Sequence, residues 1–332
     1  MSRQPASTKR SSEFARIERI GKILGVPDAT SVPVGIGDDA AVVRIGKLRL
    51  VWTTDSHVEG VHFSRALMSF QDVGFRSFNA AVSDIGAMGA SAIGALSAIA
   101  LPNALSDKSL YQIVEGQAAA ARDLGCPVIG GNLARAREVS VTTTVLGHVK
   151  KPLLRDGAQV GDEIWLIGAV GLSAAGLAWL SKGSRTRPGT ALRRAAERCV
   201  HAFRRPRALL NEGRALSGRA TSAIDISDGL VADASHLAER SGVRMALSAS
   251  AVLDQDGEDL MKVAVALGRS ALDFALFGGE DYALLATGHR RNRPNSARVI
   301  GCVEAGDGVV VVDQSGRRKP VRGGFEHFNS RA

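Results

Sequence analysis

Residues 35–55 read GIGDDAAVVRIGKLRLVWTTD. Two apolar runs, AAVVRI and LRLVWTT, are separated by Gly46-Lys47, which is typical of two strands joined by a tight turn. We therefore expect a β-hairpin over residues 40–54. Aspartates precede its first strand and follow its second, so acidic groups stand at the ends of the hairpin.

Helices and strands alternate on both sides of this hairpin. In the first half, hydrophobic periodicity predicts helices over 14–24, 71–88 and 106–124 and strands over 92–101 (buried), 128–129 and 139–149. In the second half it predicts strands over 164–167, 222–226, 243–247, 282–285, 297–303 and 309–312, with helices over 172–180, 191–202, 230–240 and 272–276. A polar connector, KKPLLRDGAQVGD, lies between the halves at residues 150–162. We expect an α/β protein with a loose leader (1–12), an N-terminal domain (13–150) and a C-terminal domain (151–332).

Composition excludes several classes of protein. The chain has 332 residues, 45% of them hydrophobic and 23% charged, which fits about two globular domains and excludes global disorder. No apolar run approaches the roughly 18 residues needed to span a bilayer, so we do not expect an integral membrane protein. The polar start is not typical of a secretory signal. The three cysteines, Cys126, Cys199 and Cys302, are far apart, which argues against disulfides and structural zinc and favours a cytoplasmic location.

The net charge of +9 is concentrated in one stretch. Between Lys182 and Arg207 nine basic residues face Glu197 alone. Nucleic-acid binding and a solvated helical face both explain such a stretch. Only one aromatic residue, Phe203, is interleaved with these arginines, so base stacking is poorly provided for and we do not expect a nucleic-acid partner.

Sequence motifs of several other enzyme classes are absent, incomplete or in the wrong structural context. Residues 35–40 fit G-x-G-x-x-A, but a strand follows where a dinucleotide fold needs a helix, and two carboxylates would face the phosphates. His57-Val58-Glu59 matches part of a deaminase zinc motif, but the required P-C-x-x-C is missing. The chain has no Walker loop and no G-x-S-x-G elbow.

Acidic residues instead recur in turns rich in glycine, serine or threonine at predicted strand ends. These turns are Gly37-Asp38-Asp39, Thr53-Thr54-Asp55, Ser83-Asp84, Asp225-Ile226-Ser227-Asp228-Gly229 and Gly278-Gly279-Glu280-Asp281. Any one of them is explained as a turn former or helix cap. Five gathered in one cleft would repel one another unless cations intervened. An all-oxygen donor set suits Mg²⁺ shared with substrate phosphates, so the pattern indicates phosphoryl transfer.

Two further features bear on phosphate binding. Gly130-Gly131-Asn132 follows a predicted strand, and paired glycines let backbone amides approach an anion; a plain β-turn is the alternative. Arg155 in the connector is either a phosphate ligand or an exposed linker charge.

Six segments together resemble the thiamine-monophosphate kinase family. They are IGDDAAVV (36–43), TTDSHVEGVHF (53–63), SDIGAMG (83–89), DISDGLVADASHLAERSG (225–242), ALFGGEDYALL (275–285) and GFEHF (324–328). Aminoimidazole ribonucleotide synthase, selenophosphate synthetase and a hydrogenase maturation factor share the Gly-Asp-Asp and Asp-Gly elements. The V-E-G-x-H-F and G-G-E-D-Y elements resemble the kinase branch.

This resemblance implies a two-domain fold like that of aminoimidazole ribonucleotide synthase, with a mixed-sheet N-terminal domain that forms a homodimer interface. It implies transfer of the γ-phosphoryl group of ATP to thiamine monophosphate, with several Mg²⁺ ions. By matching position, the magnesium ligands would be Asp38, Thr53, Thr54, Asp55, Asp84, Asp225 and Asp228. Nucleotide contacts would be Gly131, Asn132, Arg155 and Ser227, and substrate contacts His62, Glu280 and Phe325.

The chain departs from the family pattern at two places. Asn132 stands where many members carry aspartate, which removes a charge from that position, and the basic stretch is longer than expected. Two alternatives stay open: an enzyme of the same superfamily with another acceptor, and a degenerate ATP-binding scaffold with a nucleic-acid-binding segment. The selenium branch is disfavoured because the first cysteine is Cys126.

Overall fold

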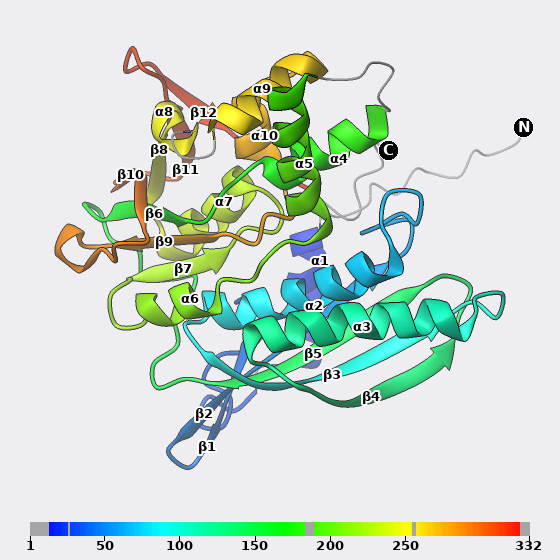
Figure 1. Cartoon of the computed structure of the whole chain (residues 1–332). Coiled ribbons are helices and arrows are strands. Elements are labelled where there is room, and N and C mark those ends of the chain that lie inside the picture. Colours follow the sequence, from blue (N-terminus) through cyan, green and yellow to red (C-terminus); the bar gives the residue numbers. More distant parts are fainter. Residues whose placement is uncertain (1–12, 26, 183–188, 254–256, 326–332) are drawn as a thin grey trace, which may run out of the picture.

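The computed structural model describes residues 13–25, 27–182, 189–253 and 257–325 and contains two mixed sheets (Figure 1). The first has the order β1-β2-β5-β3-β4, in which only β3 and β4 are parallel. Its region comprises α1 (Glu13–Leu24), β1 (Ala41–Ile45), β2 (Leu48–Val58), α2 (Phe70–Ala87), β3 (Ser91–Leu101), α3 (Asp107–Leu124), β4 (Val128–Arg135) and β5 (Ser140–His148).

The hairpin prediction is confirmed. β1 and β2 pair from Ala41 opposite Trp52 to Ile45 opposite Leu48. Gly46 in the connecting turn has a φ of +60°, a conformation that glycine adopts without steric cost.

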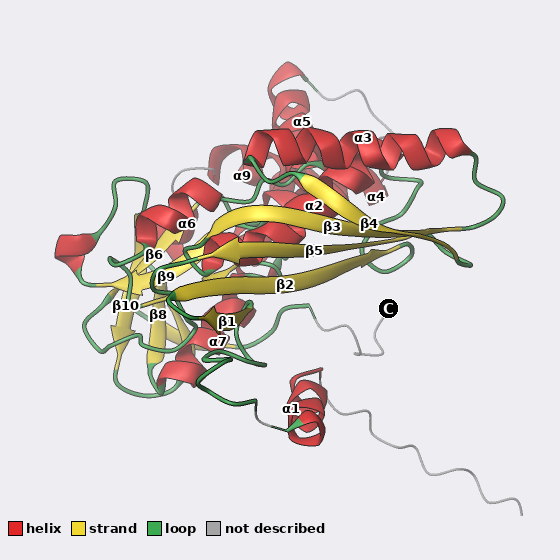
Figure 2. Cartoon of the chain, turned by 90° about the horizontal axis from the view of Figure 1, so that it is seen from below, coloured by secondary structure: helices red, strands yellow, loops and turns green. Residues whose placement is uncertain are grey.

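Helices α2 and α3 cover one face of this sheet (Figure 2). They approach so closely that a Cβ on Gly74 would meet the Ile113 carbonyl oxygen at 1.9 Å, and one on Gly116 would meet that of Gln71 at 2.0 Å. The opposite face is open, with Trp52, Ile93 and Leu96 exposed. The expectation that strand 92–101 is buried is therefore wrong for its outer side chains.

The second sheet has the order β12-β11-β8-β10-β6-β9-β7. Its strands are β6 (Glu163–Ile167), β7 (Ser222–Asp225), β8 (Arg244–Ser248), β9 (Leu284–Gly288), β10 (Arg298–Glu304), β11 (Gly308–Val312) and β12 (Arg318–Val321). Its helices are α4 (Leu172–Lys182), α5 (Thr190–Arg204), α6 (Leu210–Leu216), α7 (Leu230–Ser241), α8 (Ala249–Leu253), α9 (Gly257–Leu267), α10 (Ala271–Phe277) and the 3-10 turn η1 (Arg290–Asn292). Of these, α6, α8, α9, η1 and β12 were not predicted from the sequence.

Alternate side chains of β6 point to opposite faces of the second sheet, where they belong to two separate hydrophobic cores. Ile164 and Leu166 pack into the cluster beneath α4, α5, α7, α9 and α10. Trp165 and Ile167 face the other way and pack against Leu216 of α6 and Ala87 at the end of α2. The two sheets lie on either side of the predicted boundary at residue 150, and α2 lies between them (Figure 1). Residues of α2 therefore reach both halves.

β4 differs from its prediction. The structure extends it to residue 135, so Gly130, Gly131 and Asn132 are strand residues paired with Leu96, Ser97 and Ala98, and the β-turn alternative is wrong. The parallel register with β3 carries the strand through the two glycines.

Three other predicted features lie wholly or partly outside the described residues. The leader (1–12), Arg185, Arg187 and the end of GFEHF (326–328) lie there. Most of the remaining basic stretch lies on or just after α5, much of it exposed. No helix in the described ranges has both the length and the apolar character needed to cross a membrane.

Candidate active site

A cavity of about 340 Å³ lies where β2 and α2 meet the turns that follow β7 and α10. Nine of the predicted site residues line it: Thr54, Asp55, His62, Asp84, Asp225, Ser227, Asp228, Glu280 and Phe325. They come from both halves of the sequence. The structure thus brings together most of the acidic turns that the sequence places far apart.

The cavity adjoins three carboxylates, of which Asp39 and Asp225 are buried and Asp84 is half-buried. Oxygen atoms from all three lie within 4.8 Å of one another. Burial raises the pKa of Asp39 and of Asp225 to about 6. It also raises the pKa of Asp84 well above its ordinary value, and repulsion from the other two carboxylates adds to this rise. Three such charges in one place favour a bound cation.

The three carboxylates are fixed by different elements. Asp84 lies in the last turn of α2 and accepts a hydrogen bond from the Thr53 hydroxyl of β2. Asp39 precedes β1, and its Oδ1 accepts hydrogen bonds from Arg155 Nη2 at 2.6 Å and Nε at 3.1 Å. Asp225 ends β7.

Asp39, rather than the predicted Asp38, is the member of the Asp-Asp pair that joins this group. Asp38 is not part of this group. Its Oδ2 accepts a hydrogen bond from the backbone N–H of Arg155 at 3.2 Å, and burial raises its pKa to about 6. Arg155 is therefore tied to both aspartates. It is neither an exposed linker charge nor a residue that lines the cavity.

The donor set fits a divalent cation. Oδ2 of Asp39 is buried without a hydrogen-bond partner among the described residues, and leaving such an atom unsatisfied is costly. Carboxylate and hydroxyl oxygens are the ligands that Mg²⁺ prefers. The residues that would hold it are Asp39, Asp84 and Asp225, with Thr53 bonded to Asp84.

The turn after β7 gains its shape from local hydrogen bonds. The buried Asp233 carboxylate accepts from the backbone N–H groups of Asp228 at 3.3 Å and Gly229 at 3.1 Å. Gly229 has a φ of +116°, which is open to glycine and strained for other residues. Ser227 and Asp228 are thereby held at the cavity wall.

The 278–282 turn is clamped onto this one. The backbone N–H of Glu280 donates to Ser227 O at 2.7 Å, and that of Tyr282 donates to Ile226 O at 2.9 Å. Both residues adopt left-handed conformations, with φ of +67° and +52°. Non-glycine residues in this region are strained, and such strain concentrates at functional sites.

Part of the cavity wall is apolar. Val61, Leu177, Phe203 and Phe325 line it, together with His62. Nδ1 of His62 accepts a hydrogen bond from Val58 N at 3.1 Å, which fixes the orientation of the ring.

Two predicted nucleotide contacts lie elsewhere. Gly131 and Asn132 are on β4, and Asp55 shares a row of the sheet with Thr143, Ser97 and Gly131. At about 4.8 Å per strand, the three steps from β2 to β4 cover about 14 Å. Asn132 pairs with Ala98, so by strand alternation its side chain is on the opposite face from Asp55. One chain therefore does not bring Asn132 to its own carboxylates.

Some residues in or beside the cavity were missed by sequence reasoning. Asp39 was quoted as part of a turn but Asp38 was chosen, although adjacent residues entering a strand face opposite ways. Arg76, His57 and Phe203 also line the cavity. Arg76 could have been identified as a candidate from the sequence, because it is the single arginine within the mostly apolar 73–82 segment of α2.

Comparison with known proteins shows the family to which the chain belongs. Residues 37–149 match the family described as AIR synthase related protein, N-terminal domain. Thiamine-monophosphate kinase from Aquifex aeolicus is 33% identical over 323 residues, which cover 96% of this chain and 99% of that protein. The enzyme of the same name from Mycobacterium tuberculosis is 36% identical over 307 residues, covering 91% and 87%.

Solved structures give the same relationship. AaThiL complexed with AMPPCP and TMP aligns with a TM-score of 0.86 at 32% identity, covering 97% of this chain and 100% of that one. Hydrogenase maturation protein HypE in complex with ATP aligns with a TM-score of 0.69 at 19% identity, covering 86% and 87%, and shares the fold alone.

Proposed function

Because this chain belongs to the thiamine-monophosphate kinase family, we propose that it transfers the γ-phosphoryl group of ATP directly to thiamine monophosphate in the cavity between its two sheets. The observation that carries this proposal is the triad Asp39, Asp84 and Asp225, whose oxygens lie within 4.8 Å of one another beside the cavity. Thiamine diphosphate and ADP are the expected products.

The cavity suggests an orientation for thiamine monophosphate. Its phosphate would lie beside Asp84 and Asp225, with metal ions between it and the carboxylates, and its rings against the apolar side chains of Val61, Leu177 and Phe325. Phe325 offers an aromatic surface. Glu280 offers a carboxylate to a polar ring edge or to the cationic ring.

The residues present suit direct transfer. The acceptor is already an anionic phosphate oxygen at neutral pH, so no strong general base is needed. The work left to the protein is to hold two anions in line. Bound Mg²⁺ would supply charge neutralisation on the transferring group. Ser227 at the cavity wall and the nearby Arg155 would contribute contacts to the nucleotide.

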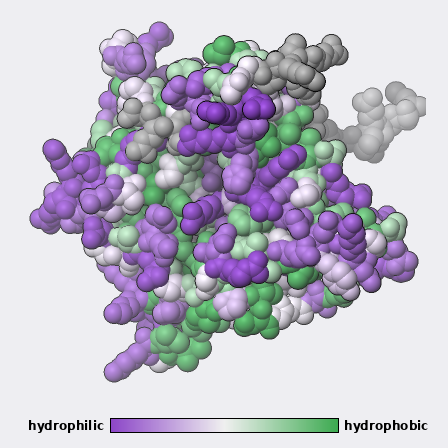
Figure 3. All heavy atoms as spheres, in the orientation of Figure 1, coloured by the Kyte–Doolittle hydropathy of each residue, from purple (hydrophilic) through white to green (hydrophobic). Residues whose placement is uncertain are grey.

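We also propose that two copies of the chain pair through the open face of the first sheet. Trp52, Ile93 and Leu96 are 52%, 44% and 46% exposed on this face, and an apolar sheet face of this kind is normally covered. In Figure 3 apolar side chains also gather at the lower edge of the molecule, where Figure 1 places the β1–β2 hairpin. A second copy would bring its own Asn132 toward the carboxylates that Asn132 does not reach within one chain.

The test is a product assay. Purified protein is incubated with ATP, Mg²⁺ and thiamine monophosphate, with free thiamine in a parallel reaction, and products are separated by chromatography. We expect equal amounts of thiamine diphosphate and ADP from the monophosphate reaction alone. ATP binding without product would instead point to another acceptor within the superfamily.

A further inference from the structure

Arg76 is a buried cation that the phosphoryl-transfer chemistry leaves without a role. It lies on α2, is 1% exposed and lines the same cavity as Glu280. An unpaired buried charge is expensive, so its partners indicate what it is for.

The partners of Arg76 come from the other half of the chain. Nη2 forms an ion pair with Glu280 Oε2, and Nη1 donates to the backbone carbonyl of Phe203. The guanidinium carbon also lies 4.9 Å from the centre of the Phe203 ring. Its Nε is buried without a hydrogen-bond partner among the described residues.

Glu280 is held by one of its two oxygens. Oε2 receives Arg76 and also the Tyr282 hydroxyl at 3.3 Å. Within the described part of the chain no hydrogen bond reaches Oε1, and the side chain remains 30% exposed. The backbone of Glu280 is meanwhile in the left-handed region. A strained residue with one engaged and one free oxygen is arranged for a ligand.

We propose that Arg76 is a positioning residue: by holding Oε2 of Glu280 it presents Oε1 to the thiamine moiety of the substrate. This inference rests on the proposed function, because it takes Glu280 as a substrate contact. Arg76 acts through Glu280 and touches neither ATP nor the transferring group. Its loss would therefore weaken recognition of thiamine monophosphate and spare the nucleotide.

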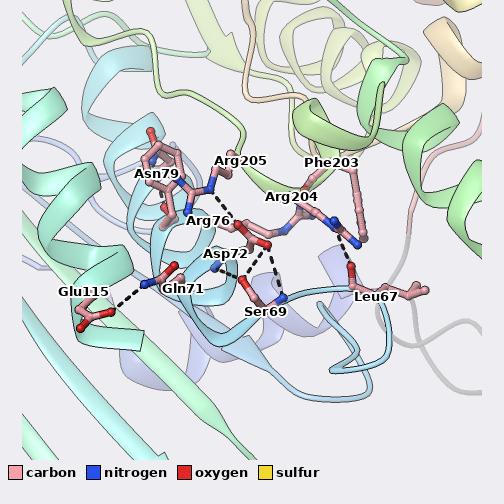
Figure 4. A network of polar contacts seen from close by, with 11 residues as sticks. Leu67, Ser69, Gln71, Asp72, Arg76, Asn79, Glu115, Phe203, Arg204 and Arg205 are labelled. Atoms are coloured by element: carbon pink, nitrogen blue, oxygen red, sulfur yellow. Dashed lines mark hydrogen bonds and ion pairs between the residues drawn. The ribbon is translucent and has the colours of Figure 1, made fainter. Parts of the chain in front are cut away.

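A matched control lies one turn further along α2. Asn79 is also 1% exposed, and its Oδ1 accepts from Ala208 N at 2.9 Å, so it too ties α2 to the segment after α5. It is absent from the cavity lining. Figure 4 shows Arg76, Asn79 and the 203–205 segment together.

The experiment is a double-mutant cycle of Arg76→Met and Glu280→Gln, with KM and kcat measured for each substrate. For Arg76→Met we expect the KM for thiamine monophosphate to rise about tenfold or more, because a charge-assisted contact is lost. The KM for ATP should be unchanged. In the Glu280→Gln background the same substitution should change that KM less than about twofold, since the partner is already altered. Arg76→Lys, which keeps the charge but cannot span both partners, should give an intermediate KM.

Asn79→Ala should lower Tm and leave both KM values unchanged. Additive effects of Arg76→Met and Glu280→Gln, or an equal rise in the KM for ATP, would overturn the positioning role. If Arg76→Met does not fold, the same cycle with Arg76→Lys decides the question. A wild-type protein without turnover of thiamine monophosphate would refute the proposed function and this inference with it, whereas an active wild type with an additive cycle refutes this inference alone.

Discussion

At the scale of single residues, the charged side chains of the candidate site differ in whether a neighbour of opposite charge stabilises them. Asp39 is compensated by Arg155, and Glu280 by Arg76. Asp84 accepts a hydrogen bond from the Thr53 hydroxyl and is repelled by the carboxylates of Asp225, Asp39 and Asp55. A carboxylate in such surroundings costs free energy unless it binds a cation.

Replacing Asp84 by asparagine should therefore separate activity from folding. We expect Asp84→Asn to lower kcat by about a thousandfold or more, because metal-assisted charge neutralisation is lost. Its Tm without metal should equal or exceed that of the wild type, because the repulsion is relieved. The matched control is Asp72→Asn, which weakens the ion pair with Arg205 and the α2 cap and should lower Tm with turnover retained. Wild-type kcat for Asp84→Asn at saturating Mg²⁺ would exclude a metal-ligand role.

The raised pKa values also predict a pH dependence. Burial raises the pKa of Asp225 to about 6, whereas an unfolded aspartate has a pKa of about 3.9. Between these two values the folded state binds more protons than the unfolded state, so the free energy of unfolding of metal-free protein should fall as pH rises through about 4 to 6. Bound Mg²⁺ should oppose this loss.

Thermal denaturation at several pH values, with EDTA or with Mg²⁺, measures the effect. The gain in Tm from Mg²⁺ should be larger at neutral pH than at about pH 5, since protonated carboxylates bind metal poorly. Asp225→Asn should reduce both the pH dependence and the gain. A gain that is independent of pH would contradict the assignment of these carboxylates.

At the scale of elements, β4 combines a structural constraint with a candidate function. A Cβ on Gly131 would lie 1.8 Å from the Ser97 carbonyl oxygen, whereas one on Gly130 would meet only the Leu96 side chain at 3.2 Å. Backbone atoms cannot shift to relieve such a contact, whereas the end of a flexible side chain can. The two adjacent glycines therefore differ sharply in what they tolerate.

Gly131→Ala should lower the free energy of unfolding by about 1–3 kcal/mol through overpacking against β3. Gly130→Ala should change it by less than about 1 kcal/mol. Chemical denaturation of both variants, with their KM for ATP, gives the comparison. Equal stability of the two variants would contradict the close β3–β4 approach.

The hairpin was predictable from sequence because its information is local: two alternating runs and a glycine turn within 15 residues. β4 was not, because its length depends on parallel pairing with β3, some 30 residues earlier in the chain. The site shows the same division. The acidic turns are visible as motifs, whereas the selection of Asp39 over Asp38 and the reach of Arg76 to Glu280 depend on which elements meet in three dimensions.

At the scale of the whole molecule, an apolar sheet face is left open while Asn132 lies about three strands from its own carboxylates. Pairing of two copies through that face would cover the apolar side chains and would bring the Asn132 of one copy toward the carboxylates of the other. Leu96→Arg should then shift the mass in solution from dimer to monomer, while Val265→Arg on the exposed side of α9 should not.

Mixing inactive variants tests whether the dimer completes the site. If Asn132 acts on the partner, mixed dimers of Asp84→Asn and Asn132→Leu contain one intact site, and refolding the two together should restore about a quarter of wild-type turnover. The separate variants should stay inactive. If mixed dimers of confirmed composition show no turnover, either Asp84 and Asn132 act in the site of the same chain or Asn132 is not part of the site.

Direct transfer between two bound phosphates is tested most directly by its stereochemistry. ATP made chiral at the γ-phosphorus with oxygen isotopes and sulfur is turned over with thiamine monophosphate, and the configuration of the product phosphorus is determined. A single in-line displacement in the cavity predicts inversion. Retention of configuration would mean two displacements through a covalent enzyme intermediate and would contradict the role assigned to the carboxylate cluster.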